Sequence, residues 1–211
     1  MIVRSVIMGL ALPLFLAACD RLVEEDSVFG QVNRFIGESE VDPRFQNAVA
    51  NERPALQLGL VNRDIQSIVM LDNRRAGIDT WISSDGAGLV TQNGMLRGAS
   101  GLEQVWLSAD ISQPLTLVSA MRGGVADRFH TYLNGEDQAV TRTYRCVVER
   151  SGPREVNLGA RVANAMLMRE TCMSLDDQFF NLYWVENGRI IQARQWAGPE
   201  VGAISTRIVA R

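Results

Sequence analysis

Cys19 is the residue whose side-chain chemistry is most informative. It is the last residue of the run Leu16-Ala17-Ala18-Cys19 and carries a thiol that can be modified covalently. Arg4 supplies a short positive segment ahead of it, and residues 6–15 form an uncharged apolar segment. This order is that of a secretory signal, and the segment is shorter than the about 20 apolar residues that a membrane-spanning helix needs. The layout predicts a signal peptide over residues 1–18, with Cys19 as the first residue of the mature chain.

The run that ends at Cys19 looks like a bacterial lipobox, at which the thiol takes a diacylglycerol and the chain is cut before the cysteine. Each buried methylene of an acyl chain contributes about 0.8 kcal/mol, and two chains hold a protein stably on a bilayer. We therefore predict a covalent lipid on Cys19, a permanent membrane anchor, and no other cofactor. Asp20 follows the anchor, and in well-studied envelopes this residue favours the inner membrane. The alternative is a plain cleaved signal, or a buried N-terminal helix, with an incidental cysteine.

Cys146 and Cys172 are the remaining cysteines, and an exported chain meets an oxidising compartment in which such a pair forms a disulfide. The enclosed loop of about 26 residues would contribute roughly 3 to 4 kcal/mol to stability in the chain-entropy model. A metal site needs more ligands than these two thiols and the single histidine, His130, supply. The sequence predicts a Cys146–Cys172 disulfide and no metal.

The composition is that of an ordinary globular domain: the chain has 211 residues, 46% of them hydrophobic and 21% charged. We expect an acidic tether over residues 19–27 and one β-rich domain over 28–211. The net charge of −3 argues against a nucleic-acid partner, because such proteins carry a basic stripe. Every basic residue is arginine, whose planar fork of donors suits carboxylates, phosphates and stacked partners.

Few residues offer catalytic chemistry. His130 lies beside Phe129 and near Tyr132, and a lone histidine among aromatics is more often packed than catalytic. The sequence contains no nucleophile elbow, P-loop, dinucleotide fingerprint or pair of histidines at zinc-ligand spacing. Asp176 and Asp177 form a carboxylate pair, which a solvated turn explains. A glycan-acting enzyme would need two acids facing one cleft, and we predict no catalytic residue.

The elements that must position these residues are mostly strands. Residues 28–36 place apolar side chains at helical spacing, which predicts one N-terminal amphipathic helix. Alternating runs rich in β-branched and aromatic residues predict strands over 56–60, 65–71, 78–83, 88–92, 104–108, 181–186, 189–196 and 203–210. Dipeptides favoured in two-residue hairpins occur at Asp85-Gly86, Asn93-Gly94, Asn134-Gly135 and Asn187-Gly188. About ten strands predict a mainly β fold, an antiparallel meander curled into a sandwich or incomplete barrel.

Aromatic and arginine residues gather on both sides of Asn187-Gly188. Trp184 precedes that turn, whereas Arg194 and Trp196 follow it, so a hairpin would bring them side by side. Aromatic faces with arginine donors can stack on sugar rings and hydrogen-bond to them, although half-buried aromatics in a sheet are commoner. Met166 and Met168 would face the core, where methionine suits an adaptable apolar pocket.

Two segments resemble the capsule and exopolysaccharide lipoproteins of the YjbF/GfcB type. The first covers residues 79–94 and 96–102, with a tryptophan, a leucine-valine-threonine strand, an asparagine-glycine turn and a closing glycine-leucine. The second covers residues 181–199, where Trp184 and the run 194–199 match the terminal hairpin of that family. Met95 departs from the family, which often has a basic residue there. The candidate glycan contacts in these segments are Trp81, Arg97, Trp184, Arg194 and Trp196.

The resemblance implies a lipid-anchored protein that faces the periplasm and serves the production or export of an extracellular polysaccharide, without catalysis. It also implies an incompletely closed antiparallel barrel. The partners would be the membrane, envelope proteins of polysaccharide export and the polysaccharide itself. The family is mostly placed at the outer membrane, which we favour over the inner membrane. The alternatives are a carrier that encloses a lipid or glycan inside the curled sheet and, behind it, a glycan-acting enzyme.

Overall fold

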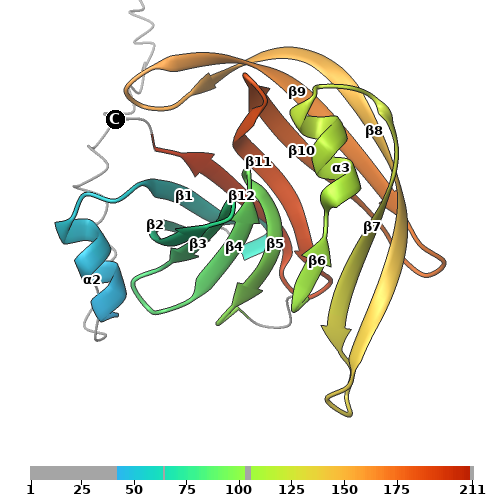
Figure 1. Cartoon of the computed structure of the whole chain (residues 1–211), viewed down its shortest axis with the longest axis horizontal. Coiled ribbons are helices and arrows are strands. Elements are labelled where there is room, and N and C mark those ends of the chain that lie inside the picture. The colour runs from blue at the N-terminus through green and yellow to red at the C-terminus, as the bar shows by residue number, and fades with distance from the viewer. Residues whose placement is uncertain (1–41, 64, 103–105, 210–211) are drawn as a thin grey trace, which may run out of the picture.

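The computed structural model describes residues 42–63, 65–102 and 106–209, and an antiparallel sheet dominates them (Figure 1). Its strands are β1 (Ala55–Leu60), β2 (Ile65–Arg75), β3 (Ile78–Ile82), β4 (Gly88–Gln92), β5 (Met95–Ser100), β6 (Ser108–Asp110), β7 (Gly124–Leu133), β8 (Ala139–Asn157), β9 (Val162–Met173), β10 (Gln178–Glu186), β11 (Arg189–Gly198) and β12 (Gly202–Ile208). The described helices are α2 (Pro43–Ala50), α3 (Ser112–Ser119) and the short 3-10 helix η1 (Val61–Arg63). The predicted signal peptide, Cys19 and the helix expected over 28–36 lie outside the described residues.

The strands form one 12-stranded sheet in the order β5-β4-β3-β2-β1-β12-β11-β10-β9-β8-β7-β6. β1 pairs with both β2 and β12, so the first and last described strands lie side by side in mid-sheet. The sheet curls until its edges approach, and a Cβ atom on Gly98 of β5 would lie 2.9 Å from the carbonyl oxygen of Leu107, just before β6. The predicted mainly β fold, an incompletely closed antiparallel barrel, is confirmed.

Two of the predicted hairpin turns are confirmed. Asn93-Gly94 joins β4 to β5 with φ angles of 48° and 85°, and Asn187-Gly188 joins β10 to β11 with 51° and 77°. Two successive positive φ angles give the turn that matches the twist of paired strands. Ala76-Gly77, between β2 and β3, adopts the same geometry with φ angles of 50° and 76°, although it has no asparagine to signal the turn.

Other local predictions are corrected. Asp85-Gly86 lies within a wider loop over residues 83–87, and Asn134-Gly135 opens a loop over 134–138. The second loop is wider because Asn134 Oδ1 accepts hydrogen bonds from the backbone N–H groups of Glu136 (3.0 Å) and Gln138 (2.9 Å). Of the strand expected over 104–108, residues 104–105 lie outside the described residues, and the described strand β6 covers Ser108–Asp110, after the buried Trp106.

The helices α2 and α3 were not predicted, because each is too short to show a clear helical period. Asp42 caps α2 by accepting the Arg44 N–H at 2.8 Å, and Pro43 fits its first turn. The helix packs Phe45 on the outside of the sheet. α3 is fixed at one end of the barrel, where the Asn93 amide donates to Ser119 Oγ at 3.0 Å and to the Gly188 carbonyl at 2.8 Å.

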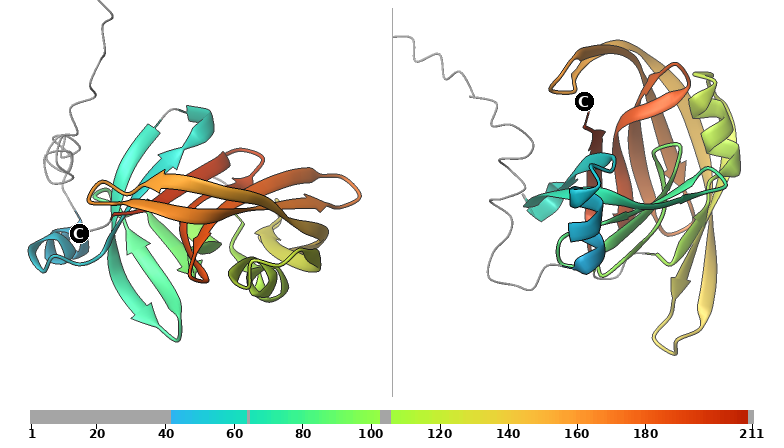
Figure 2. Two further views of the ribbon diagram at one scale, coloured as in Figure 1. Left: turned by 90° about the horizontal axis from the view of Figure 1, so that it is seen from above. Right: turned by 60° about the vertical axis from the view of Figure 1, so that its left-hand side comes forward.

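Side chains fill the interior of the barrel. Trp106, Tyr183 and Met168 are each 0% exposed within one large apolar cluster. The far end of the long β8–β9 hairpin bends over the outside of the sheet toward the C-terminal end of the described chain (Figure 2). There its apolar residues pack on Ile191, next to Trp184. The outer face of β10–β12 is therefore partly covered, and the uncovered part beside it forms a groove.

Candidate functional site

The structure places two of the predicted glycan-contacting tryptophans in packed surroundings. Trp81 is 4% exposed, and its Nε1 donates to Thr91 Oγ1 at 2.9 Å. The ring of Trp196 stacks on Phe179, with 4.4 Å between the ring centroids and 7° between the planes. Trp81 is thus almost wholly buried at the wall of a small cavity, and Trp196 belongs to an aromatic cluster.

The remaining three predicted contacts divide between two places. Arg97 is half-buried on β5, where it donates to Gln92 Oε1 at 3.4 Å. Trp184 and Arg194 instead line a common groove of about 530 Å³ on the outer face of the sheet. Of the five predicted contacts, only Trp184 and Arg194 therefore line this groove. Trp81, Arg97 and Trp196 do not line it.

Strand register builds this outer groove from two rows of neighbours across β10, β11, β12 and β1. Successive pairings give the first row as Trp184, Gln192, Arg207 and Gln57. The same pairings give the second row as Arg194, Ser205 and Gly59. Residues at the β1–β2 connection close one end of the groove, namely Leu60, Val61, Ile65 and Gln66. Alternation along the strands places these polar rows opposite the apolar core.

The floor of the groove depends on Gly59. Its partner across the β1–β12 ladder is Ser205, and a Cβ atom on Gly59 would lie 2.5 Å from Ser205 Oγ. Because real Cβ atoms need more room than this, any larger residue would have to displace the Ser205 side chain into the groove. The glycine therefore keeps the centre of the groove open.

Both arginines of the groove are held by neighbours. The Arg194 guanidinium lies over the Phe180 ring, 4.5 Å from its centroid, and Arg169 lies over the same ring at 4.6 Å. Arg207 Nε donates to Gln192 Oε1 at 2.6 Å. Among the described residues that line the groove, none is an aspartate or glutamate. The groove is thus a positively charged strip on a chain whose net charge is negative.

A second polar group, which was not predicted, lies inside the barrel. Arg128 of β7 donates to both carboxylate oxygens of Glu170 on β9, at 3.1 and 2.9 Å. Tyr183 and Asn181 donate to the same carboxylate at 2.7 and 2.8 Å, and all four residues are at most 1% exposed. Burial alone would lower the pKa of Arg128, but Glu170 and Tyr183 raise it above its ordinary value. Burial and Glu170 together raise the pKa of Tyr183. The group is a permanent ion pair with its acceptors satisfied.

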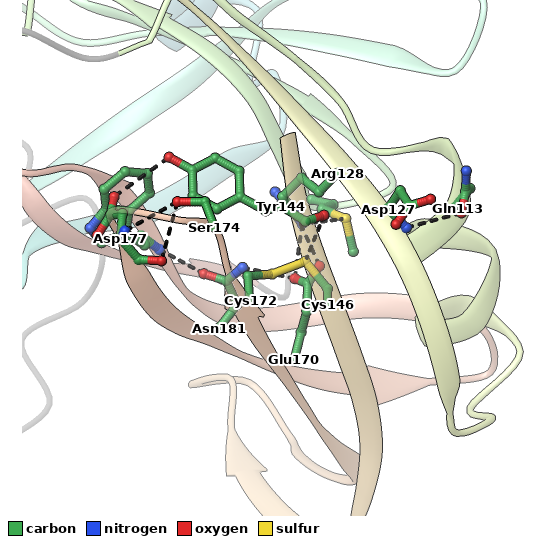
Figure 3. The surroundings of a disulfide bond; sticks show 12 residues. Gln113, Asp127, Arg128, Tyr144, Cys146, Glu170, Cys172, Ser174, Asp177 and Asn181 are labelled. Atoms are coloured by element: carbon green, nitrogen blue, oxygen red, sulfur yellow. Dashed lines mark hydrogen bonds and ion pairs between the residues drawn. A yellow bond between two sulfur atoms is a disulfide. The ribbon is translucent and has the colours of Figure 1, made fainter. Parts of the chain in front are cut away.

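The predicted disulfide is confirmed. Cys146 and Cys172 face each other directly across the β8–β9 ladder and are bonded beside Glu170 (Figure 3). Glu170 lies within reach of both sulfur atoms, so the three residues have the spacing of metal ligands. Both sulfurs, however, are used in the disulfide, and the carboxylate is used by Arg128, so this group is not free to bind a cation.

His130 is fully buried among aromatic rings, with Trp106 stacked on it at 4.7 Å between centroids. Neither imidazole nitrogen has a hydrogen-bond partner among the described residues. Burial, with a smaller contribution from Arg128, lowers the pKa of His130 to about 2. Such an imidazole is too weak a base for proton transfer at neutral pH. Asp176 and Asp177 lie in the turn between β9 and β10, as a solvated turn predicts.

A smaller cavity of about 270 Å³ opens at the barrel end formed by the β2–β3 and β4–β5 turns. Polar groups line much of it, including the Arg74–Asp79 ion pair (2.6 Å) and Thr91. Met168 faces the core, as predicted, and is 0% exposed among packed side chains. This packing gives no support to a lipid carrier that uses the interior of the sheet.

The fold and the site together define the class of protein. It is an incompletely closed antiparallel barrel with a packed interior and an outer groove that is lined by two arginines. The described helices include none long and apolar enough to cross a membrane. The family described as group 4 capsule polysaccharide lipoprotein gfcB, YjbF matches residues 32–209, and the chain belongs to this family. The resemblance predicted from residues 79–102 and 181–199 is confirmed.

The crystal structure of the hypothetical lipoprotein YmcC from Escherichia coli (K12) has the same fold. It superposes with a TM-score of 0.67 at 22% sequence identity, over 89% of this chain and 97% of that one. No functionally curated protein matches the chain. The neighbour therefore supports the fold, and the family match links the chain to capsule lipoproteins.

Proposed function

We propose that the protein is a lipid-anchored, non-enzymatic accessory in the production or export of a capsular or extracellular polysaccharide. The observation that carries this proposal is the family match over residues 32–209, which covers nearly the whole predicted mature chain. The lipobox-like run at Cys19 supports it independently. The anchored protein would face the periplasm and work beside envelope proteins of polysaccharide export.

The proposed organisation is a signal peptide over residues 1–18, a lipidated Cys19 with an acidic tether over 19–27, and a β-rich domain over 28–211. The covalent lipid would be its sole prosthetic group. We place the protein at the outer membrane, as is usual for lipoproteins of this kind, despite Asp20. An anchored β-barrel with a packed interior is suited to holding a partner or a polymer on its surface.

Deletion of the gene tests the proposal. We expect the deletion to lower the amount of surface polysaccharide under conditions that induce it, and the intact gene supplied in trans to restore it. The measurement is the polysaccharide released from washed cells, quantified as sugar per cell. An unchanged yield in the deletion strain would overturn the accessory function.

A further inference from the structure

We propose that the outer groove binds an acidic segment of a polysaccharide chain, with Arg194 and Arg207 pairing with sugar carboxylates and Trp184 packing against a sugar ring. The proposal names the ligand class of the proposed function and rests on it. Its basis is the groove itself: two guanidinium groups, an indole and several amides in adjacent rows of one sheet face.

The charge of the groove favours an acidic ligand. Two arginines and no described acid line the groove, so its described lining is formally positive although the whole chain carries a net charge of −3. Arginine binds carboxylates through parallel N–H···O bonds, which are about twice as strong as neutral hydrogen bonds. A neutral glycan would leave both guanidinium groups without a counter-charge, whereas an acidic glycan would supply one to each.

Both groove arginines keep hydrogen-bond donors that a ligand could use. The Arg194 guanidinium is positioned by the Phe180 ring and makes no hydrogen bond to another described residue. Arg207 uses Nε toward Gln192, and its two terminal nitrogens have no described hydrogen-bond partner. Stacking and the Gln192 bond hold both side chains in place, so binding a carboxylate costs less side-chain entropy than it would for free arginines.

The shape of the groove favours a sugar polymer over a lipid. At the centre of the groove Gly59 contributes no side chain, and only the small Ser205 hydroxyl lies over it. Amide groups from Gln57, Gln66 and Gln192 provide the paired donors and acceptors that ring hydroxyls need. Apolar side chains cluster at the β1–β2 end, so the groove lacks a continuous apolar path for an acyl chain. Its volume of about 530 Å³ fits a few sugar units.

Calorimetric titration of the full-length protein in detergent micelles tests this assignment. The probes are a short oligogalacturonate, which carries a carboxylate on every ring, and a neutral maltooligosaccharide of the same length. We expect the acidic probe to bind at least about tenfold more tightly than the neutral one, and added salt to weaken it. Arg194→Gln and Arg207→Gln should each weaken oligogalacturonate binding by about tenfold.

Arg169→Gln is the matched control, because Arg169 stacks on the same Phe180 ring as Arg194 but does not line the groove. We expect wild-type binding from this variant. Trp184→Leu keeps an apolar side chain beside Ile191 and removes the ring, so it should weaken binding of the acidic probe. Thermal melting of each variant identifies any that fails to fold, and the remaining variants then decide the assignment.

Equal affinity for the two oligosaccharides would overturn the proposal, as would wild-type affinity in both groove arginine variants. Glycerol phosphate that competes as strongly as the oligogalacturonate would also overturn it, since the groove would then recognise phosphate and not an acidic sugar. The titrations test binding in the groove, and the gene deletion tests the accessory function. A negative titration would overturn only the binding proposal, whereas an unchanged polysaccharide yield after deletion would overturn the accessory function.

Discussion

The Arg128–Glu170 pair joins β7 to β9 through the barrel interior, where water solvates neither charge. Removing one partner of a buried pair leaves the other charge uncompensated, which costs about 3 to 5 kcal/mol. We expect Glu170→Gln to lower the free energy of unfolding by that amount, measured by urea denaturation. The control is Glu186→Gln, which breaks the exposed Arg161–Glu186 pair and should have little effect. A Glu170→Gln variant that unfolds at the wild-type urea concentration would contradict the structural role of the pair.

His130 makes stability depend on pH. Burial lowers its pKa from 6.5 in the unfolded chain to about 2, so below pH 6.5 the unfolded state binds the proton more strongly. Its contribution to stability is therefore complete above pH 6.5 and is lost at up to about 1.4 kcal/mol per pH unit as the pH falls toward 2. We expect His130→Phe, which keeps an aromatic ring beside Trp106, to flatten the pH dependence between about pH 6.5 and 4.5. Parallel urea curves for both proteins at each pH provide the measurement, and identical slopes would refute this account.

At the scale of elements, glycine at the two-residue turns has two separate roles. Gly77 and Gly94 share a positive φ (76° and 85°), but a Cβ atom on Gly77 would meet nothing within 4 Å, whereas one on Gly94 would lie 2.8 Å from Ile190 Cβ. We expect Gly77→Ala to cost about 1 to 2 kcal/mol from backbone strain alone. Gly94→Ala should cost a further 1 to 3 kcal/mol, roughly, because it also overpacks the contact between the β4–β5 turn and β11. Equal melting temperatures for the two variants would show that this contact does not hold the barrel together.

The sequence predicts those elements whose signals are local. β4 and the Asn93-Gly94 and Asn187-Gly188 turns follow from alternation and turn chemistry over a few residues, and so does the proximity of Trp184 to Arg194. The pairing of Arg128 with Glu170 has no local signal, because the two residues are 42 positions apart and each looks like an exposed strand charge.

The surroundings of the tryptophans also depend on contacts between distant parts of the chain. Trp81 lies in the main apolar cluster with Trp106 and Met168, which come from distant parts of the chain. The groove likewise needs β1 beside β12, a pairing between opposite ends of the described chain. Neither feature can be derived from periodicity within one strand.

At the scale of the whole molecule, the proposed anchor limits where the groove can act. The chain between Cys19 and the described domain that begins at residue 42 spans at most about 80 Å even when fully extended. The groove would therefore stay close to one membrane surface. An anchored binding surface meets a polymer mainly where it crosses that membrane, which favours an accessory beside an export machine over a protein that diffuses through the periplasm.

The anchor itself is tested by fractionating cells on a density gradient. We expect the wild-type protein in the outer-membrane fraction and Cys19→Ala absent from it, because the variant has no thiol to receive the diacylglycerol. Loss of the anchor should also lower polysaccharide yield toward that of the deletion strain, since the groove is no longer concentrated at the membrane. The Asp20→Ser variant distinguishes between the two membrane locations. If the wild-type protein is in the outer membrane, this variant should remain there. Wild-type protein at inner-membrane density that moves to the outer membrane in Asp20→Ser would instead show that Asp20 retains it, and would place the groove at the start of export.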